Sequence, residues 1–250
     1  MNFDWSVLGA PLLAGLLVTA THVVLGRRVL ERGIIFIDLT IAQIAALGAV
    51  AWAVAGLPEG HGWGLAAAGS AAFMAAALLA WTERKLPDLQ EAIIGSLYVV
   101  AASFAILLVA HSPHGSEHLE ELLAGQILWV GFSQVWPVAV IYLPLLALWI
   151  VWARHRPAVF YFVFAVAVMV SVQLVGVFLV FASLILPALA THGLSERRGL
   201  ALGYGVSAVG YAFGLWLSVP LDLPAGPLIV CVLASLALLT GLVRYLAARR

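Results

Sequence analysis

The sequence predicts an all-α protein, a polytopic transmembrane helical bundle with about nine membrane helices (eight or nine). Of its 250 residues, 64% are hydrophobic and only 10% are charged, and the mean hydropathy is +1.10. A soluble domain carries roughly 25% charged residues, so lipid must cover much of this surface. The apolar runs are about 15–25 residues long and lack the alternation of barrel strands, which favours helices.

The expected spans follow one another with short polar segments between them. The apolar runs lie near residues 6–25, 34–56, 62–81, 91–110, 131–152, 158–190, 199–218 and 227–246. We interpret the first as a retained helix, because Asp4 stands where a signal peptide is basic and no basic residue precedes Arg27. We find no soluble domain and expect residues 1–250 to form a single transmembrane domain.

The basic residues predict the orientation of the helices. All twelve Lys and Arg lie in five places, within 27–32, 84–85, 154–156, 197–198 and 244–250. Loops with positive charge stay in the cytoplasm, so we expect the N-terminus outside and the C-terminus inside. Basic residues spread along one membrane face also make binding to nucleic acid implausible, and lipid is the expected neighbour.

The same charges predict a break in the run 158–190. Both flanks of this run are basic, and its 33 residues are too many for one span of about 20. We therefore predict two short helices, about 158–172 and 177–190, that meet between Gln173 and Gly176. A re-entrant pair that does not fully cross is the alternative. A broken helix that faces a cavity is typical of transporters.

Few polar side chains in the apolar runs have the chemistry of a transport pathway. Asp38 and His22 both lie toward the expected cytoplasmic ends of their runs, and a carboxylate with an imidazole suits a divalent metal or a proton relay. The alternatives are an Asp38 ion pair with Arg27, Arg28 or Arg32, and a His22 that is simply hydrogen-bonded. Gln43 is a secondary candidate, either as a ligand or as a helix–helix hydrogen bond. It stands about 140° around the helix from Asp38.

A second candidate metal site lies in an expected outer loop. Three imidazoles and a carboxylate within eight residues can bind zinc or a similar cation. These residues are His111, His114, Glu117 and His118. Pro113 and Gly115 argue against a preformed helical site, and a solvated loop is the alternative reading.

Several motifs together resemble the membrane permeases of zinc/manganese-type ABC transporters. The longest match is Val175-Gly-Val-Phe-Leu-Val-Phe-Ala-Ser-Leu-Ile-Leu-Pro187-Ala, which is similar to the family's VG-(apolar)-LIIPAA segment. Leu221-Asp-Leu-Pro-Ala-Gly226 is similar to its D-x-P-A-G signature. Further blocks are Glu91-Ala-Ile-Ile-Gly95, Leu123-Ala-Gly-Gln-Ile-Leu128 and Arg27-Arg28.

The resemblance implies a bacterial inner-membrane, multi-pass subunit that imports zinc or manganese. It implies a homodimer, two cytoplasmic ATP-binding subunits and a periplasmic or extracellular metal-binding protein. The chain itself is then no enzyme, since ATP is hydrolysed on a separate subunit, and it holds no prosthetic group. The basic turn after Pro187 is the expected ATPase contact, with a plain positive-inside turn as the alternative. Its residues are His192, Ser195, Glu196, Arg197 and Arg198.

The chain departs from the family pattern in two places. The family usually has a G-D-x-x-x-H pattern at the start of the second helix. In this chain Leu39 stands at the position of the Asp and Gln43 at that of the His, and Asp38 comes one residue early. The usual acidic stretch before the VG helix is reduced to Arg154-His-Arg-Pro157. Two alternatives therefore stay open, an ABC permease for a metal chelate or other small solute and an accessory membrane subunit that does not transport.

Overall fold

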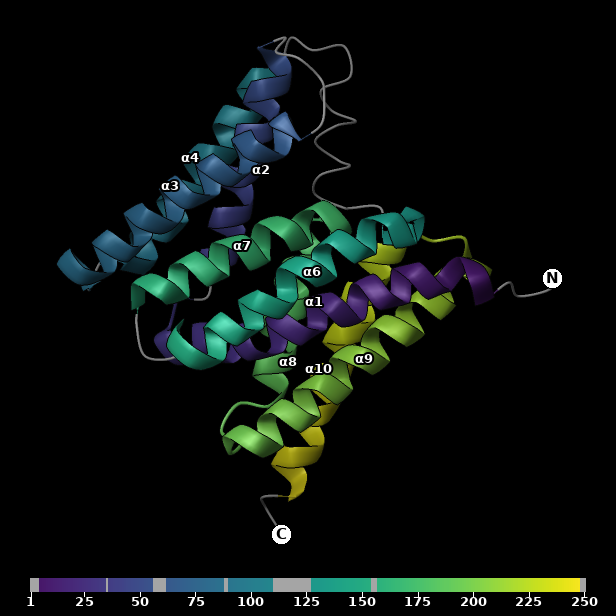
Figure 1. The fold of residues 1–250 in the computed structure, drawn as a ribbon. Helices are drawn as coiled ribbons and strands as arrows, with labels where there is room; N and C mark the ends of the chain where they lie inside the picture. The colour runs from purple at the N-terminus through teal and green to yellow at the C-terminus, as the bar shows by residue number, and fades with distance from the viewer. Residues whose placement is uncertain are drawn as a thin grey trace. The chain divides into compact units, whose positions relative to one another are not determined.

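The computed structural model describes residues 5–34, 36–55, 62–87, 90–109, 127–153 and 157–247. Within these ranges all regular structure is helical, and nine α-helices are present (Figure 1). They are α1 (Trp5–Arg32), α2 (Ile37–Val54), α3 (Trp63–Lys85), α4 (Gln90–Val109), α6 (Phe132–Leu148), α7 (Pro157–Val175), α8 (Val177–Ala190), α9 (Glu196–Leu221) and α10 (Ala225–Ala247). The predicted all-α fold with about nine helices is confirmed.

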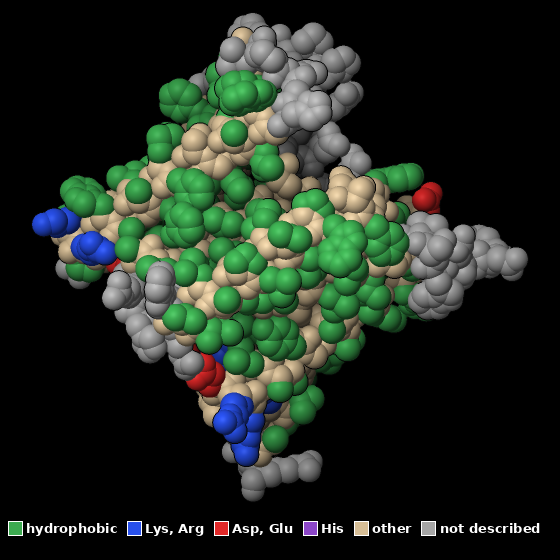
Figure 2. Space-filling view, viewed as in Figure 1, with side chains coloured by type: hydrophobic (Ala, Val, Ile, Leu, Met, Phe, Trp, Pro, Cys, Tyr) green, Lys and Arg blue, Asp and Glu red, His purple; other side chains and the backbone are tan. Residues whose placement is uncertain are grey.

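Most of these helices have the length and composition of membrane spans. In the described residues, seven are long and apolar enough to cross a bilayer, whereas α8 is apolar but has only 14 residues. Large apolar side chains face outward, including Trp136, Leu143 and Leu238, each more than 70% exposed. Figure 2 shows one face covered mainly by hydrophobic side chains, with Lys and Arg only at its margins. Such a surface is stable in lipid and would aggregate in water.

The chain forms two compact units. The first comprises Met1–Arg32, Ala124–Tyr142 and Leu174–Arg250, and the second comprises Gly33–Leu123 and Leu143–Gln173. The prediction of a single domain over residues 1–250 stays a prediction.

In the first unit, α1 packs against α8 and α9, and α10 packs against α8 and α9. The Tyr211 ring lies where a side chain on Gly15 would stand, which brings α9 close to α1. The Tyr211 hydroxyl and the Ser183 hydroxyl of α8 are 2.6 Å apart and form a buried hydrogen bond. This polar pair and the small residues around it lock three helices together, as is common in membrane bundles.

In the second unit, α2 packs against both α3 and α4. Thr40 Oγ1 donates to the Ile94 carbonyl at 2.9 Å, joining α2 to α4. The Gln90 amide donates to the Leu79 carbonyl at 3.1 Å and to the Tyr161 hydroxyl at 3.3 Å, which joins α4 to α3 and α7. Buried polar side chains therefore make interhelical contacts where lipid offers no hydrogen-bond partner.

The predicted break in the run 158–190 is confirmed. α7 ends at Val175 and α8 begins at Val177, with Gly176 between them at φ 81° and ψ 164°. The helices extend to within three residues of the predicted ends. Whether this pair crosses the bilayer twice or is re-entrant stays a prediction.

Candidate functional site

Asp38 lies in the first turn of α2 and is fully buried. Neither carboxylate oxygen accepts a hydrogen bond of good geometry from the described residues, although the backbone N–H groups of Asp38 itself and of Leu39 act on the carboxylate. The helix N-terminus favours a negative charge there, but that interaction alone does not replace the lost water. A buried carboxylate without well-formed hydrogen bonds requires a proton, a water or a cation beside it. Asp38 is therefore a buried acidic position whose partner is a proton, a water or a cation.

Two of the three arginines considered as ion-pair partners of Asp38, Arg27 and Arg28, have acceptors elsewhere. Arg27 donates to the Thr191 and Leu194 carbonyls, and Arg28 pairs with Glu31 at 2.8 Å. Both guanidinium groups therefore already have acceptors within the first unit.

Gln43 is buried on the same helix as Asp38. Because α2 is a regular α-helix over both positions, the five-residue spacing places their side chains about 140° apart. The two residues therefore project in different directions, as the sequence indicated. Thr40, between them, is committed to the α4 contact.

His22 is fully buried on α1, in the first unit. Its Nδ1 lies 3.0 Å from the Val18 carbonyl and 3.0 Å from Thr21 Oγ1. A carbonyl only accepts, so this geometry assigns the proton to Nδ1 and leaves a lone pair on Nε2, which has no partner among the described residues. Histidines that bind metals characteristically donate their other ring N–H to a backbone carbonyl in this way.

The remaining predicted metal ligands belong to the 111–118 segment. His111, His114, Glu117 and His118 lie outside the described residues, as do the positions 154–156. Over the described ranges, no group of three or more His, Cys, Asp and Glu side chains has the geometry of a metal site. Asp38 and Gln43 lie on α2 of the second unit, and His22 lies on α1 of the first.

The predicted ATPase-contact residues lie together at one end of the first unit. His192, Ser195, Glu196, Arg197 and Arg198 are all exposed, in the turn between α8 and α9 and in the first turn of α9. Arg27 and Arg244 reach the same turn from α1 and α10. The basic ends of α1, α9 and α10 thus lie together at one end of the first unit.

The contacts of Arg27 and Arg244 are not indicated by any sequence motif. Their partners are backbone carbonyls 164 and 54 residues away, respectively, along the chain. Arg244 stands in the last turn of α10, where a basic residue is also expected simply to complement the helix dipole.

Comparison with known proteins decides the family. The profile of the ABC 3 transport family matches residues 5–156 and 154–244, which together cover nearly the whole chain. The chain belongs to the ABC 3 transport family. It is a multi-pass membrane subunit of that transporter class, as the resemblance implied.

A solved structure has the same fold as this ABC 3 family chain. PsaBC from Streptococcus pneumoniae in complex with Fab superposes with a TM-score of 0.73 at 21% identity. The match covers 100% of this chain and 96% of the matched chain. No curated protein matches the sequence significantly.

Proposed function

We propose that the chain is the membrane permease subunit of an ABC transporter that imports a divalent metal cation, zinc or manganese. Family membership supports the transporter class. The single observation that supports a cation is Asp38, a carboxylate fully buried in a membrane helix with no hydrogen bond of good geometry from the described residues. Such residues are costly inside a membrane and mark ion pathways.

The cation would pass from one polar position to the next during alternating access. Asp38 supplies the negative charge, His22 supplies a neutral nitrogen lone pair, and Gln43 supplies an amide oxygen. Oxygen and nitrogen ligands of this kind suit zinc and manganese. The histidines of the 111–118 segment would raise the local concentration of metal at the entrance.

The energy source and the partners follow from the transporter class. ATP would be hydrolysed by two cytoplasmic ATP-binding subunits that contact the α8–α9 turn, and an external metal-binding protein would deliver the ion. The functional unit would be a homodimer in a bacterial inner membrane, with the N-terminus outside and the C-terminus inside.

The decisive experiment compares metal uptake by the wild type and by Asp38→Asn, which keeps the side-chain size but removes the charge. We expect uptake of zinc or manganese to fall by about tenfold or more, because the loss of even an outer partner of a metal site costs that much. Asp222→Asn is the matched control, since Asp222 is exposed and Asn tolerates its left-handed backbone, φ 52°.

Two outcomes would contradict the proposal. Normal uptake by Asp38→Asn at wild-type membrane abundance would remove Asp38 from the pathway. Purification of the wild type without any ATP-binding subunit would favour an accessory protein, and uptake of a chelate rather than of free metal would change the substrate.

A further inference from the structure

The turn between α8 and α9 is held by hydrogen bonds from two other helices. α8 ends at Ala190; the carbonyls of Pro187, Ala188 and Leu189 accept from the backbone N–H groups of Thr191 and His192, and that of Ala190 accepts from an arginine. The carbonyls of Ala190, Thr191, His192 and Leu194 bond to the guanidinium groups of Arg27 and Arg244.

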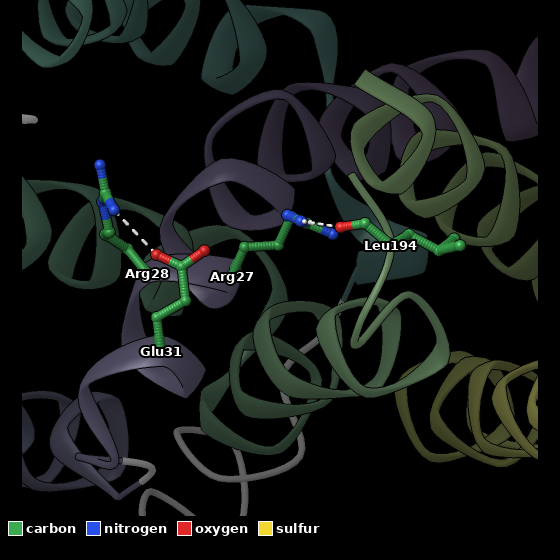
Figure 3. A network of polar contacts seen from close by, with 4 residues as sticks. All are labelled: Arg27, Arg28, Glu31 and Leu194. Carbon is green, nitrogen blue, oxygen red and sulfur yellow. Dashed lines mark hydrogen bonds and ion pairs between the residues drawn. The ribbon is translucent and has the colours of Figure 1, made fainter. Parts of the chain in front are cut away.

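Arg27 joins the turn to α1. Its Nη1 donates to the carbonyl and to Oγ1 of Thr191, both at 3.3 Å, and its Nη2 donates to the Leu194 carbonyl at 3.1 Å (Figure 3). The guanidinium occupies the space where Gly199 of α9 has no side chain, and a Cβ there would overlap it. One arginine therefore bridges α1 and both sides of the turn.

Arg244 joins the same turn to α10. Its Nη1 donates to the Ala190 carbonyl and its Nη2 to the His192 carbonyl, each at 2.7 Å. Hydrogen bonds from a charged donor are shorter and stronger than neutral ones, and a cation at a helix C-terminus also stabilises the helix dipole.

Apolar packing does not fill the space between the turn and α1. A hollow of about 370 Å³ lies there, lined by Arg27, Leu30 and Glu31 of α1 and by His192, Leu194 and Ser195. The Arg27 hydrogen bonds therefore cross a region that side chains leave partly open. Movement of the turn can be passed to α1 through these bonds, and α1 carries His22 five residues before Arg27.

The neighbouring Arg28 shows that not every arginine at this end of the unit bonds to the α8–α9 turn. Arg28 makes an ion pair with Glu31 of its own helix, three residues on, and both side chains are substantially exposed (Figure 3). Exposed pairs of this kind contribute little. Its ion pair stays within α1 in the part of the chain that the structure describes, so Arg28 is the matched control.

We propose that Arg27 and Arg244 are positioning residues for energy coupling. They fasten the α8–α9 turn to α1 and α10, so that displacement of the turn by the ATP-binding subunits moves both helices. The proposal rests on the proposed function for the identity of the partner at the turn. It adds the two residues through which movement of the turn is transmitted to α1 and α10.

The test uses two readouts on Arg27→Ala, Arg244→Ala and Arg28→Ala. The first is amide hydrogen exchange of residues 190–196 in the chain reconstituted in lipid nanodiscs, which needs no partner. Loss of one charge-assisted hydrogen bond corresponds to about tenfold in the opening equilibrium, so we expect exchange about tenfold faster or more in the first two variants. Arg28→Ala should exchange like the wild type.

The second readout is the ratio of zinc or manganese taken up to ATP hydrolysed by the complex reconstituted with its ATP-binding subunits. We expect this ratio to fall about tenfold in Arg27→Ala and Arg244→Ala, and to stay unchanged in Arg28→Ala. Arg27→Lys and Arg244→Lys keep the charge but lose the paired donors, so they should give intermediate ratios and serve where the alanine variants do not fold.

The outcomes separate this proposal from the proposed function. Unchanged exchange in both variants would overturn it whatever the chain transports. Faster exchange with an unchanged ratio would reduce the two arginines to a structural role and would also overturn it. A wild-type complex that hydrolyses ATP without moving metal would instead contradict the proposed function. The exchange data would still test whether Arg27 and Arg244 hold the α8–α9 turn.

Discussion

Replacement of Gly176 by alanine tests the helix break on which the fold of residues 157–190 depends. Gly176 has φ 81° and ψ 164°. Only glycine adopts this region readily, and another residue held there costs about 1–3 kcal/mol. Val175 and Val177 on either side are 0% and 1% exposed, so the surrounding packing resists a change of backbone. We expect most of that cost to appear as lost stability.

The cost converts into a measurable shift of the unfolding temperature. For a chain of this length, 1 kcal/mol corresponds to roughly 2–4 °C, so Gly176→Ala should unfold about 2–12 °C below the wild type. The assay is thermal unfolding in detergent, followed by the fluorescence of the nine tryptophans. Gly205→Ala is the control, because Gly205 is exposed within α9 and a Cβ there meets open space.

The control variant should change stability in the opposite direction. Alanine is favoured over glycine inside a helix by about 1 kcal/mol, so Gly205→Ala should equal or exceed the wild type. If Gly176→Ala were as stable as Gly205→Ala, residue 176 would not have a left-handed backbone in the native protein. The run would then be continuous there, and the interpretation of α7 and α8 as separate helices would be wrong.

Further substitutions test one buried polar contact in each unit. Tyr211→Phe removes the hydrogen bond to Ser183, and we expect the free energy of unfolding to fall by about 0.5–1.5 kcal/mol in the same assay. If the losses of Tyr211→Phe and Ser183→Ala simply add in the double variant, the two hydroxyls do not interact. Thr40→Val removes the donor to the Ile94 carbonyl and should cost about 1 kcal/mol or more, since that carbonyl loses a buried partner. Ser70→Ala, which removes a bond within one exposed turn, should cost less, and an equal loss would contradict the assignment.

The sequence predicts the helices well because hydropathy and charge act over whole segments. Its errors are at the ends, as α9 illustrates. The apolar run begins at residue 199, but the helix begins at Glu196, since backbone hydrogen bonding continues into polar residues that hydropathy excludes. Ser195 at the N-cap is the local signal that marks this start. The break at Gly176 was predictable because the run 158–190 is too long for one span and has basic residues on both flanks.

The site is less predictable because its properties depend on partners far along the chain. The sequence identifies Asp38 and His22 as polar residues in apolar runs. The Nδ1 bond of His22 to Val18 follows from helix geometry, since the two are four residues apart. Arg27, by contrast, donates hydrogen bonds to the Thr191 and Leu194 carbonyls rather than pairing with Asp38. These contacts depend on how α1 packs against α8 and α9, which the sequence does not reveal.

The motif that first suggested the family corresponds to one structural element. Val175-Gly176 is the break at which α8 begins, and Pro187 lies in the last turn of α8, where Thr191 Oγ1 donates to its carbonyl at 2.8 Å. The turn that follows is fastened by two arginines. α8 is therefore a short buried helix with a backbone break at one end and charged hydrogen bonds at the other, and it adjoins α1, α9 and α10. We therefore expect α8 to move as a rigid body with the turn, as the proposed transmission of movement requires.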